Sequence, residues 1–279
     1  MKQYRKMVYP YVAWISIMVV VPMLLIMFYA FTKDGNAVLD FVFTLDNFKK
    51  FFSDSIFISV LGRSLKIAVI TTVICIALGY PAGYFISKCA DGVKMRWILI
   101  ITFPTWINMM VRTYAWRGIL QDEGIINHFL GIFGIGPVTM LNTGFAVVLG
   151  MVYNFLPFMI IQIYTSLAKL DTSLLEAAAD LGANRTKSFL KVTLPLSIPG
   201  VLSGITLVFL PAVSSFYIPE MLGGGRYYMV GNLIETQFLT TENWNFGSAV
   251  SLIMVIIIII SMYFTRKADK TEIMEQRGN

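Results

Sequence analysis

Apolar residues are collected into long runs along the chain, and these runs predict membrane-spanning helices. A helix needs about 20 mainly apolar residues to cross the hydrocarbon core of a bilayer. Uncharged stretches of at least this length cover residues 7–32, 67–87, 144–167, 192–219 and 243–265, and a sixth candidate, 97–116, is interrupted by Arg112. We therefore expect an all-α polytopic membrane protein with one membrane domain over residues 1–279. Its six spans are expected at about residues 8–31, 67–87, 97–116, 144–167, 198–219 and 244–265.

The composition agrees with a lipid-exposed surface. Hydrophobic residues make up 57% of the 279 residues and charged residues 14%, and the mean hydropathy is +0.71. Soluble domains usually contain about 25% charged residues. The net charge of +6 could suggest nucleic-acid binding, but the basic residues lie between apolar runs. Orientation in a bilayer explains this placement better, and we expect no nucleic-acid partner.

The distribution of charge also predicts which side each loop faces. With six spans, both termini lie on one side together with the segments near residues 88–96 and 168–197. These segments hold 14 of the 22 basic and 7 of the 16 acidic residues, a net charge of +7, whereas the other side has a net charge of −1. Cytoplasmic segments of plasma-membrane proteins carry the excess of Lys and Arg. We therefore expect both termini to be cytoplasmic.

The first apolar run is longer than that of a signal peptide. The first apolar run follows Lys2, Arg5 and Lys6, as in a signal peptide, but it exceeds the usual apolar region of about 7–15 residues. No small-residue cleavage site follows it, so we expect a retained anchor.

Cys75, Cys89 and His128 have neither disulfide nor metal-site spacing. We expect no metal site and no catalytic residue.

The loop at residues 169–197 has the local pattern of two short helices. Ser173 and Glu176 have the spacing of a capping box, in which each side chain pairs with a free backbone N–H of the first turn. Gly182 stands where a helix commonly ends in a left-handed conformation. A second, basic helix is expected to stop before Leu194–Pro195. A simple cytoplasmic linker could have this pattern, but the three consecutive alanines at 177–179 suit close docking against a partner.

This loop resembles the EAA loop of permeases from binding-protein-dependent ABC importers. Glu176-Ala177-Ala178, Gly182, Val192 and Leu194-Pro195 follow the pattern EAA-x3-G-x9-I-x-LP, with Val in place of Ile. The resemblance implies the type I importer permease (MetI-like) fold and a coupling role for Glu176, Ala177, Ala178, Gly182, Leu194 and Pro195. It also implies three partners: a dimer of ABC ATPase subunits, a second homologous permease and an extracytoplasmic substrate-binding protein.

The sequence contains no nucleotide-binding loop. The phosphate loop GxxxxGK followed by Ser or Thr is missing, and no Gly is followed by Lys. We expect a transporter subunit without an ATPase site and without a cofactor. ATP and magnesium would be bound by the partner ATPase.

Two further segments resemble the spermidine/putrescine type of permease. They are FPTWINMMVRTYAWRGIL at 103–120 and the series LP, FY, P-E-x-LGG, GN-x-I, QF and W-x-FG within 207–249. Polyamines carry separated ammonium groups, which carboxylates and aromatic faces attract. Candidate pathway residues are accordingly Glu220, Tyr217, Trp106, Asn108, Tyr153 and Asn154. A solvated loop carboxylate and helix-packing hydrogen bonds are the alternative explanations for them. Arg112 would repel a polyamine, so we interpret it as an interfacial anchor or as a structural group lining a gate.

Other transport functions stay open at this point. An ABC importer of the same family could carry ferric ion or an amino-acid-like solute. A secondary transporter would need charged residues inside its spans for ion coupling, and Arg112 is the one such residue.

Overall fold

The structure, a computed structural model, describes residues 2–33 and 42–278, and the side chains of residues 8–33 and 42–263. Within these ranges the regular structure is helical, apart from one β-bridge between Thr32 and Phe43. The all-α prediction is therefore confirmed. Contacts divide the chain into two compact units, which are described separately below.

Five helices of the described chain are long and apolar enough to cross a membrane. They are α1 (Lys2–Ala30), α3 (Ser55–Lys88), α7 (Gly144–Leu167), the continuous helical stretch Arg185–Ser214, which ends in α10 (Leu194–Ser214), and α13 (Trp244–Gly278). They confirm a multi-pass membrane protein. The count of six is not confirmed, because the remaining predicted span is not a single helix. The charged termini used to orient the chain lie outside the residues with described side chains.

The predicted span at 97–116 is a broken helix. It consists of α4 (Asp91–Thr102), the short 3₁₀ turn η1 (Phe103–Trp106) and α5 (Met109–Leu120). Pro104 lies in the first turn of η1 and Ile107 is extended, with ψ 140°. A proline cannot donate a backbone hydrogen bond, so carbonyls before it lose their usual partners. Threonine hydroxyls add hydrogen bonds beside the break, because Thr102 Oγ1 donates to the Ile98 carbonyl at 2.7 Å and Thr105 Oγ1 to the Thr102 carbonyl at 2.6 Å.

The predicted span at 198–219 has different limits in the structure. The helix α10 starts at Leu194 and ends at Ser214, and Ser215 is extended, with ψ 135°. A separate short helix, α11 (Tyr217–Gly223), follows. The prediction that one helix continues to residue 219 is therefore wrong. The extended Ser215 separates the two helices and sets α11 apart from the end of α10.

The first unit contains the described residues up to Leu61 together with Val230–Ile258. Its short helices are α2 (Asp46–Ser53) and α12 (Val230–Leu239). The Asn245 side-chain amide, at the start of α13, donates to the carbonyls of Tyr29 and Thr32 at 3.2 and 3.0 Å. The last carbonyls of a helix have no partner within it, so Asn245 satisfies groups left free at the end of α1.

The second unit contains Gly62–Met229 and is built around α7. The helices α3 and α10 approach α7 through glycines spaced four residues apart, Gly79 and Gly83 on α3 and Gly200 and Gly204 on α10. A Cβ at Gly79 would lie 2.8 Å from Met159 Cγ, and one at Gly204 would lie 2.5 Å from Met159 Sδ. Small residues at such positions let membrane helices pack at close distance, where dispersion replaces the missing hydrophobic effect.

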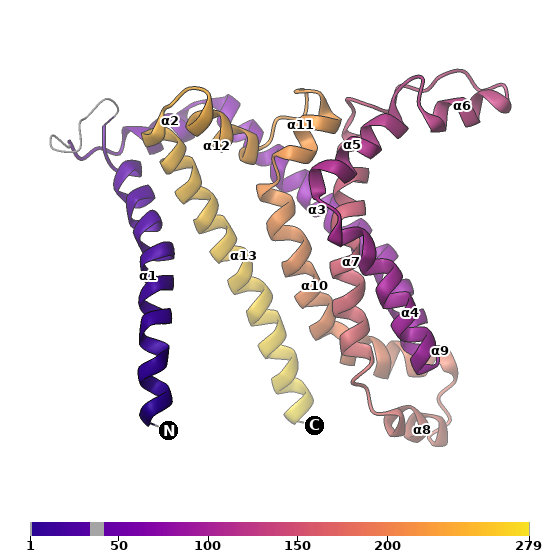
Figure 1. Ribbon diagram of the computed structural model, residues 1–279. Coiled ribbons are helices and arrows are strands. Elements are labelled where there is room, and N and C mark those ends of the chain that lie inside the picture. Colours follow the sequence, from indigo (N-terminus) through magenta and orange to yellow (C-terminus); the bar gives the residue numbers. More distant parts are fainter. Residues whose placement is uncertain (1, 34–41, 279) are drawn as a thin grey trace. The chain divides into compact units, whose positions relative to one another are not determined.

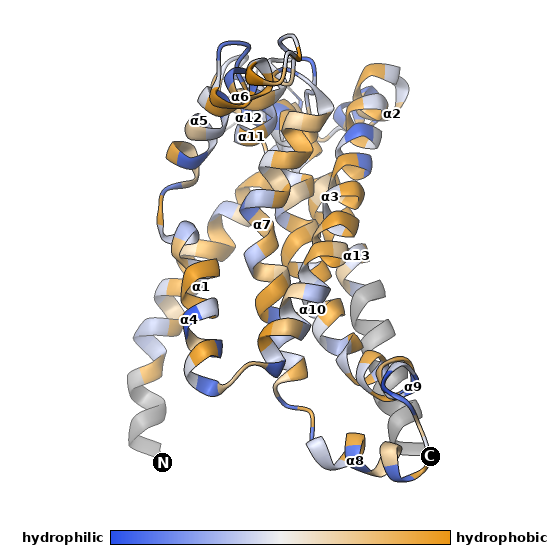
Figure 2. Ribbon diagram, turned by 90° about the vertical axis from the view of Figure 1, so that its right-hand side faces the viewer, coloured by the Kyte–Doolittle hydropathy of each residue, from blue (hydrophilic) through white to orange (hydrophobic). Residues whose placement is uncertain are grey.

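The ends of this second unit carry different elements. Figure 1 shows α8 (Thr172–Asp180) and α9 (Arg185–Ser188) at one end of α7 and α10, and α5, α6 (Ile125–Ile132) and α11 at the other. Figure 2 shows mainly hydrophobic residues along the middle of α7 and α10, and a mixture of hydrophobic and hydrophilic residues on α8. The predicted coupling loop and the predicted pathway residues on α11 therefore lie at opposite ends of the unit.

Candidate functional sites

The helix α8 begins at a different cap from the one predicted. Asp171 is the N-cap, and its Oδ1 accepts a hydrogen bond of 3.0 Å from the Ser173 backbone N–H. This bond, together with the Ser173 hydroxyl, lowers the pKa of the Asp171 carboxyl below its usual value. The prediction of Ser173 as the N-cap is therefore wrong. Aspartate caps as well as serine does, and Asp171 stands two residues earlier.

The end of α8 confirms the predicted role of Gly182 in stopping the helix. Gly182 has a φ of +80°, in the left-handed region. Its N–H donates to the Ala179 carbonyl at 2.9 Å, and the Ala183 N–H donates to the Ala178 carbonyl at 3.0 Å. These two bonds make the Schellman motif, which pairs carbonyls that the helix would otherwise leave free. A side chain here is disfavoured by the backbone conformation alone, because a Cβ would meet nothing within 4 Å.

Small and apolar groups are exposed along α8. Glu176 and Ala177 are exposed, Ala178 is half-buried, and the Leu181 side chain is 90% exposed. An apolar side chain so fully exposed beside an alanine face is unusual for a helix that simply links two spans. The face is available to a partner, because its residues are exposed and the main contacts of α8 in the described chain are with α9 and with the turn that follows α9.

The second helix of the loop does not stop before Leu194–Pro195, contrary to prediction. After α9 the chain forms one π-helical turn, η2 (Phe189–Thr193), and continues directly into α10. The Leu194 N–H bonds to the Phe189 carbonyl, five residues back. Pro195 follows this widened turn directly, so its missing N–H falls inside the continuous helical stretch Arg185–Ser214. The wider turn admits the proline without ending the helix, and such π-turns are frequent at functional sites.

An aromatic clamp, made of Tyr80, Tyr84 and Phe189, joins this turn to α3. The Phe189 ring meets both tyrosine rings edge to face, with centroid distances of 5.9 Å to Tyr80 and 5.4 Å to Tyr84. The Tyr80 hydroxyl also lies 2.8 Å from Ser197 Oγ on α10. Sequence reasoning missed this clamp. The available signal was a pair of tyrosines one helical turn apart in an apolar run, beside Pro81.

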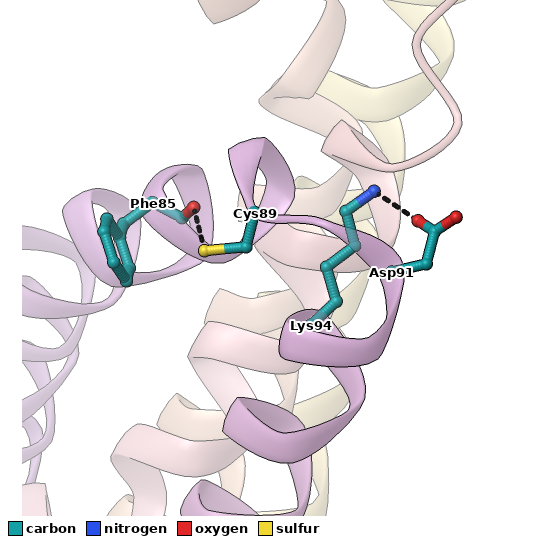
Figure 3. A network of polar contacts seen from close by, with 4 residues as sticks. All are labelled: Phe85, Cys89, Asp91 and Lys94. Carbon is teal, nitrogen blue, oxygen red and sulfur yellow. Dashed lines mark hydrogen bonds and ion pairs between the residues drawn. The ribbon is translucent and has the colours of Figure 1, made fainter.

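The connection between α3 and α4 lies on the same predicted side of the membrane as the coupling loop. Figure 3 shows Cys89 Sγ donating to the Phe85 carbonyl at 3.4 Å and Lys94 Nζ paired with Asp91 Oδ1 at 2.9 Å. The hydrogen bond and charge of Lys94 lower the pKa of Asp91. Asp91 opens α4, where the helix dipole also favours a negative charge. These contacts fix the start of α4 and suggest no ligand.

Trp106 and Asn108, two of the predicted pathway residues, lie at the break between η1 and α5. Trp106 ends η1 and is 72% exposed. Asn108 is the N-cap of α5, and its Oδ1 accepts from the Met110 N–H at 2.7 Å. The cap gives Asn108 a structural role that the sequence left open. Both residues mark the place where the apolar helix is interrupted.

Tyr217 and Glu220 lie together on α11. Glu220 is exposed and Tyr217 half-buried, one turn apart on this short helix. The helix packs on α7 and on α5, and Gly150 of α7 gives room for Leu222 of α11. The two residues therefore lie on a separate short helix at the end of α7 opposite the loop at 169–197, and not at the end of a long span.

Tyr153 and Asn154 are adjacent on α7 but have different surroundings. The Tyr153 ring meets Trp116 of α5 at 5.4 Å, and the guanidinium carbon of Arg112 lies 6.0 Å from the Tyr153 ring centre. Asn154 is 2% exposed and donates to the Gly150 carbonyl at 2.8 Å. Its Oδ1 has no partner in the described chain. Of the six predicted pathway residues, the structure therefore brings Tyr217 near Glu220 and places Tyr153 in an aromatic and cationic group.

Comparison with known proteins gives one family and several close relatives. Residues 75–270 match the family described as binding-protein-dependent transport system inner membrane component. The spermidine/putrescine transport system permease protein PotB of Haemophilus influenzae is 38% identical over 261 residues, with 92% of this chain and 91% of that protein covered. PotB of Escherichia coli K12 is 37% identical, with 95% and 97% covered. The permease YdcU of the same strain is 29% identical, with 80% and 75% covered.

Solved structures share the fold at low sequence identity. A bacterial ABC transporter that imports the acidic polysaccharide alginate, in complex with its alginate-bound periplasmic protein, matches with a TM-score of 0.80 at 16% identity. The match covers 94% of this chain and 92% of that one. The MetNI methionine ABC transporter matches with a TM-score of 0.59, covering 77% and 95%. The same fold thus occurs in transporters of solutes as different as alginate and methionine, so the fold by itself does not identify a solute.

Proposed function

Because the chain belongs to the family of binding-protein-dependent transport system inner membrane components, we propose that it is a membrane-spanning subunit of an ATP-driven importer for polyamines such as spermidine and putrescine. The observation that carries this proposal is the identity of 36–38% to PotB permeases over more than nine-tenths of the chain. The segments at 103–120 and within 207–249 resemble the same group. The subunit would work beside a second, homologous permease.

In this proposal, the loop at 169–197 is the coupling element. Ala177 and Ala178 present small side chains beside Glu176 on one helix, and Gly182 ends that helix. Leu194 and Pro195 begin α10, which continues the helical stretch that starts at Arg185. A separate pair of ABC ATPase subunits, which bind ATP and magnesium, would dock here. The exposed alanine face and the exposed Leu181 support this assignment.

The other end of the second unit would admit the solute from an extracytoplasmic binding protein. Glu220 offers a carboxylate, and Tyr217, Tyr153 and Trp106 offer aromatic faces; both kinds of group attract ammonium ions. Asn108, at the break before α5, and Asn154, in the middle of α7, would add polar groups to this route. Alternation between outward and inward access would follow closure of the ATPase pair, with both termini of this chain in the cytoplasm.

Uptake by cells tests the proposal directly. Deletion of the gene for this chain is expected to abolish uptake of labelled spermidine and putrescine and to leave uptake of labelled methionine unchanged. A plasmid copy would restore polyamine uptake, and the Glu220→Gln copy would restore it only in part, because one carboxylate is lost. Unchanged polyamine uptake in the deletion strain would reject the substrate assignment. Full restoration by Glu220→Gln would remove that residue from the pathway.

A further inference from the structure

Arg112 occupies an unusual position on α5. Its guanidinium carbon lies 6.0 Å from the centre of the Tyr153 ring, which in turn packs edge to face against Trp116 at 5.4 Å. The Nε and Nη1 atoms of Arg112 are buried and have no hydrogen-bond partner in the described chain. Guanidinium groups in proteins are normally held by several acceptors. Here the one favourable contact is the aromatic face.

This arrangement holds the cation weakly. A cation over the face of an aromatic ring is attracted by the negative charge of the ring face, and guanidinium and ammonium groups are both attracted in this way. A buried N–H without an acceptor is costly, because it has lost its hydrogen bonds to water. The Arg112 side chain is therefore poorly satisfied where it lies, and another cation could take its place on the ring.

Resting on the proposed function, we infer that the face of Tyr153, supported by Trp116, is a cation-binding subsite of the translocation pathway, and that Arg112 closes it. The guanidinium acts as a tethered cation that fills the subsite when no solute is present. An ammonium group of the substrate displaces it during transport. Two cations cannot share the ring face because they repel each other, so the subsite is either closed or loaded.

The contacts of α5 support the placement of this subsite on the solute's route. α5 packs on α11, the helix that carries Tyr217 and Glu220, and α5 also packs on α7. Arg117, one and a half turns further along α5, differs from Arg112: it is exposed, and its Nη1 lies 3.9 Å from the sulfur of Met221. It therefore provides a matched control with the same charge on the same helix.

The test uses the complete importer in liposomes, containing this chain, its partner permease, the ATPase and the binding protein. Liposomes are loaded with labelled spermidine or with labelled tetramethylammonium, which cannot lose a proton and cross the bilayer as a neutral amine, and efflux without ATP is measured. Arg112→Gln is expected to raise the efflux of both cations about tenfold, because the cation that closes the subsite is gone. Arg112→Lys and the control Arg117→Gln are expected to stay as tight as wild type.

A second pair of variants tests the aromatic face. Tyr153→Phe keeps the ring and is expected to keep both tight closure and ATP-driven uptake. Tyr153→Leu removes the face and is expected to leak and to lose most uptake. Equal behaviour of the two Tyr153 variants, or an Arg112→Gln complex as tight as wild type, would overturn the inference. So would failure of Arg112→Gln to co-purify with the partner permease, which would make Arg112 an assembly contact.

ATP-driven spermidine uptake by the wild-type complex distinguishes a failure of the proposed function from a failure of the inference about Arg112. If the wild-type complex does not import spermidine with ATP, the substrate assignment fails. The tetramethylammonium efflux of Arg112→Gln still decides whether Arg112 closes a cation path.

Discussion

At the scale of single residues, the two ends of α8 show how local chemistry shapes the proposed coupling element. Asp171 pairs with the first free N–H groups, and Gly182 adopts the left-handed conformation that ends the helix. Neither residue is buried, so neither depends on a packed core. Changes at both positions are therefore expected to alter the shape of the loop while leaving the membrane helices intact.

Replacement of Gly182 by valine is expected to abolish the stimulation of the partner ATPase by loaded binding protein. A left-handed conformation costs a residue with a side chain about 1–2 kcal/mol, which lowers the population of the correctly ended helix about tenfold. Asparagine tolerates this conformation better, so Gly182→Asn should retain more activity. The measurement is ATPase activity of the reconstituted importer, with membrane insertion checked in parallel.

Gly134 supplies the control for this substitution. It also has a positive φ, +72°, with nothing within 4 Å of its would-be Cβ, but it lies in the loop after α6. Gly134→Val carries a similar backbone penalty away from α8 and is expected to leave ATPase stimulation unchanged. Equal loss in both variants would show that Gly182 acts through general misfolding.

The cap at Asp171 predicts a pH dependence. The pKa of this carboxyl is lowered in the folded protein, so its stabilising effect is present above the unfolded pKa of about 3.9 and is lost as the pH falls through the folded pKa. Hydrogen exchange of the α8 amides, followed by mass spectrometry, should show a loss of protection below about pH 4 beyond the intrinsic pH effect. Asp171→Asn, which caps without titrating, should not show this loss. If the asparagine variant shows the same loss, Asp171 is not its source.

At the scale of elements, the π-turn η2 and the aromatic clamp connect the loop to two long helices. Phe189 contacts Tyr80 and Tyr84 on α3, and η2 continues into α10 without a break. In the proposed function, a displacement of the loop at 169–197 would reach α3 through the packed rings and α10 through the continuous helical backbone after Arg185.

Phe189→Ala is expected to uncouple the importer. Each edge-to-face ring pair contributes roughly 0.5–1.5 kcal/mol beyond its buried area, and the substitution removes two of them. We expect ATP hydrolysis to continue while uptake per ATP falls severalfold. Tyr80→Phe, which removes only the hydroxyl contact to Ser197, should cause a smaller loss. Unchanged uptake per ATP in Phe189→Ala would show that the clamp is not part of the coupling path.

The elements also show what the sequence can and cannot predict. The limits of α7 match the predicted span at 144–167, because a helix packed on several sides is apolar throughout. The break at 102–108 was not predicted, because a proline such as Pro104 in an apolar run is compatible with either a kink or an interruption. The continuation through Leu194–Pro195 was missed because it depends on a π-turn, which hydropathy does not reveal. The clamp joins residues more than a hundred positions apart, and no local pattern indicates such a contact.

At the scale of the whole molecule, the orientation in the membrane is the main untested expectation. It predicts that Gly136 and Gly225 face outward and that Ala183 faces the cytoplasm. Alkaline phosphatase, which is active only outside, is expected to be active when fused after Gly136 or Gly225 and inactive when fused after Ala183. Green fluorescent protein fusions should give the reverse pattern. Activity after Ala183 would invert the topology, and an inactive Gly136 fusion would mean that the broken helix α4–η1–α5 does not cross.

The side chain of Met159 has a consequence for the evolution of this protein. It lies against both Gly79 of α3 and Gly204 of α10, so one residue helps to set how near two different helices lie to α7. A larger residue at position 79 or 204 fits only where position 159 becomes smaller. In a broad set of relatives, the side-chain volumes at these three positions are therefore expected to covary, with their sum nearly constant. That compensation would be visible in sequences long before any further structure is determined.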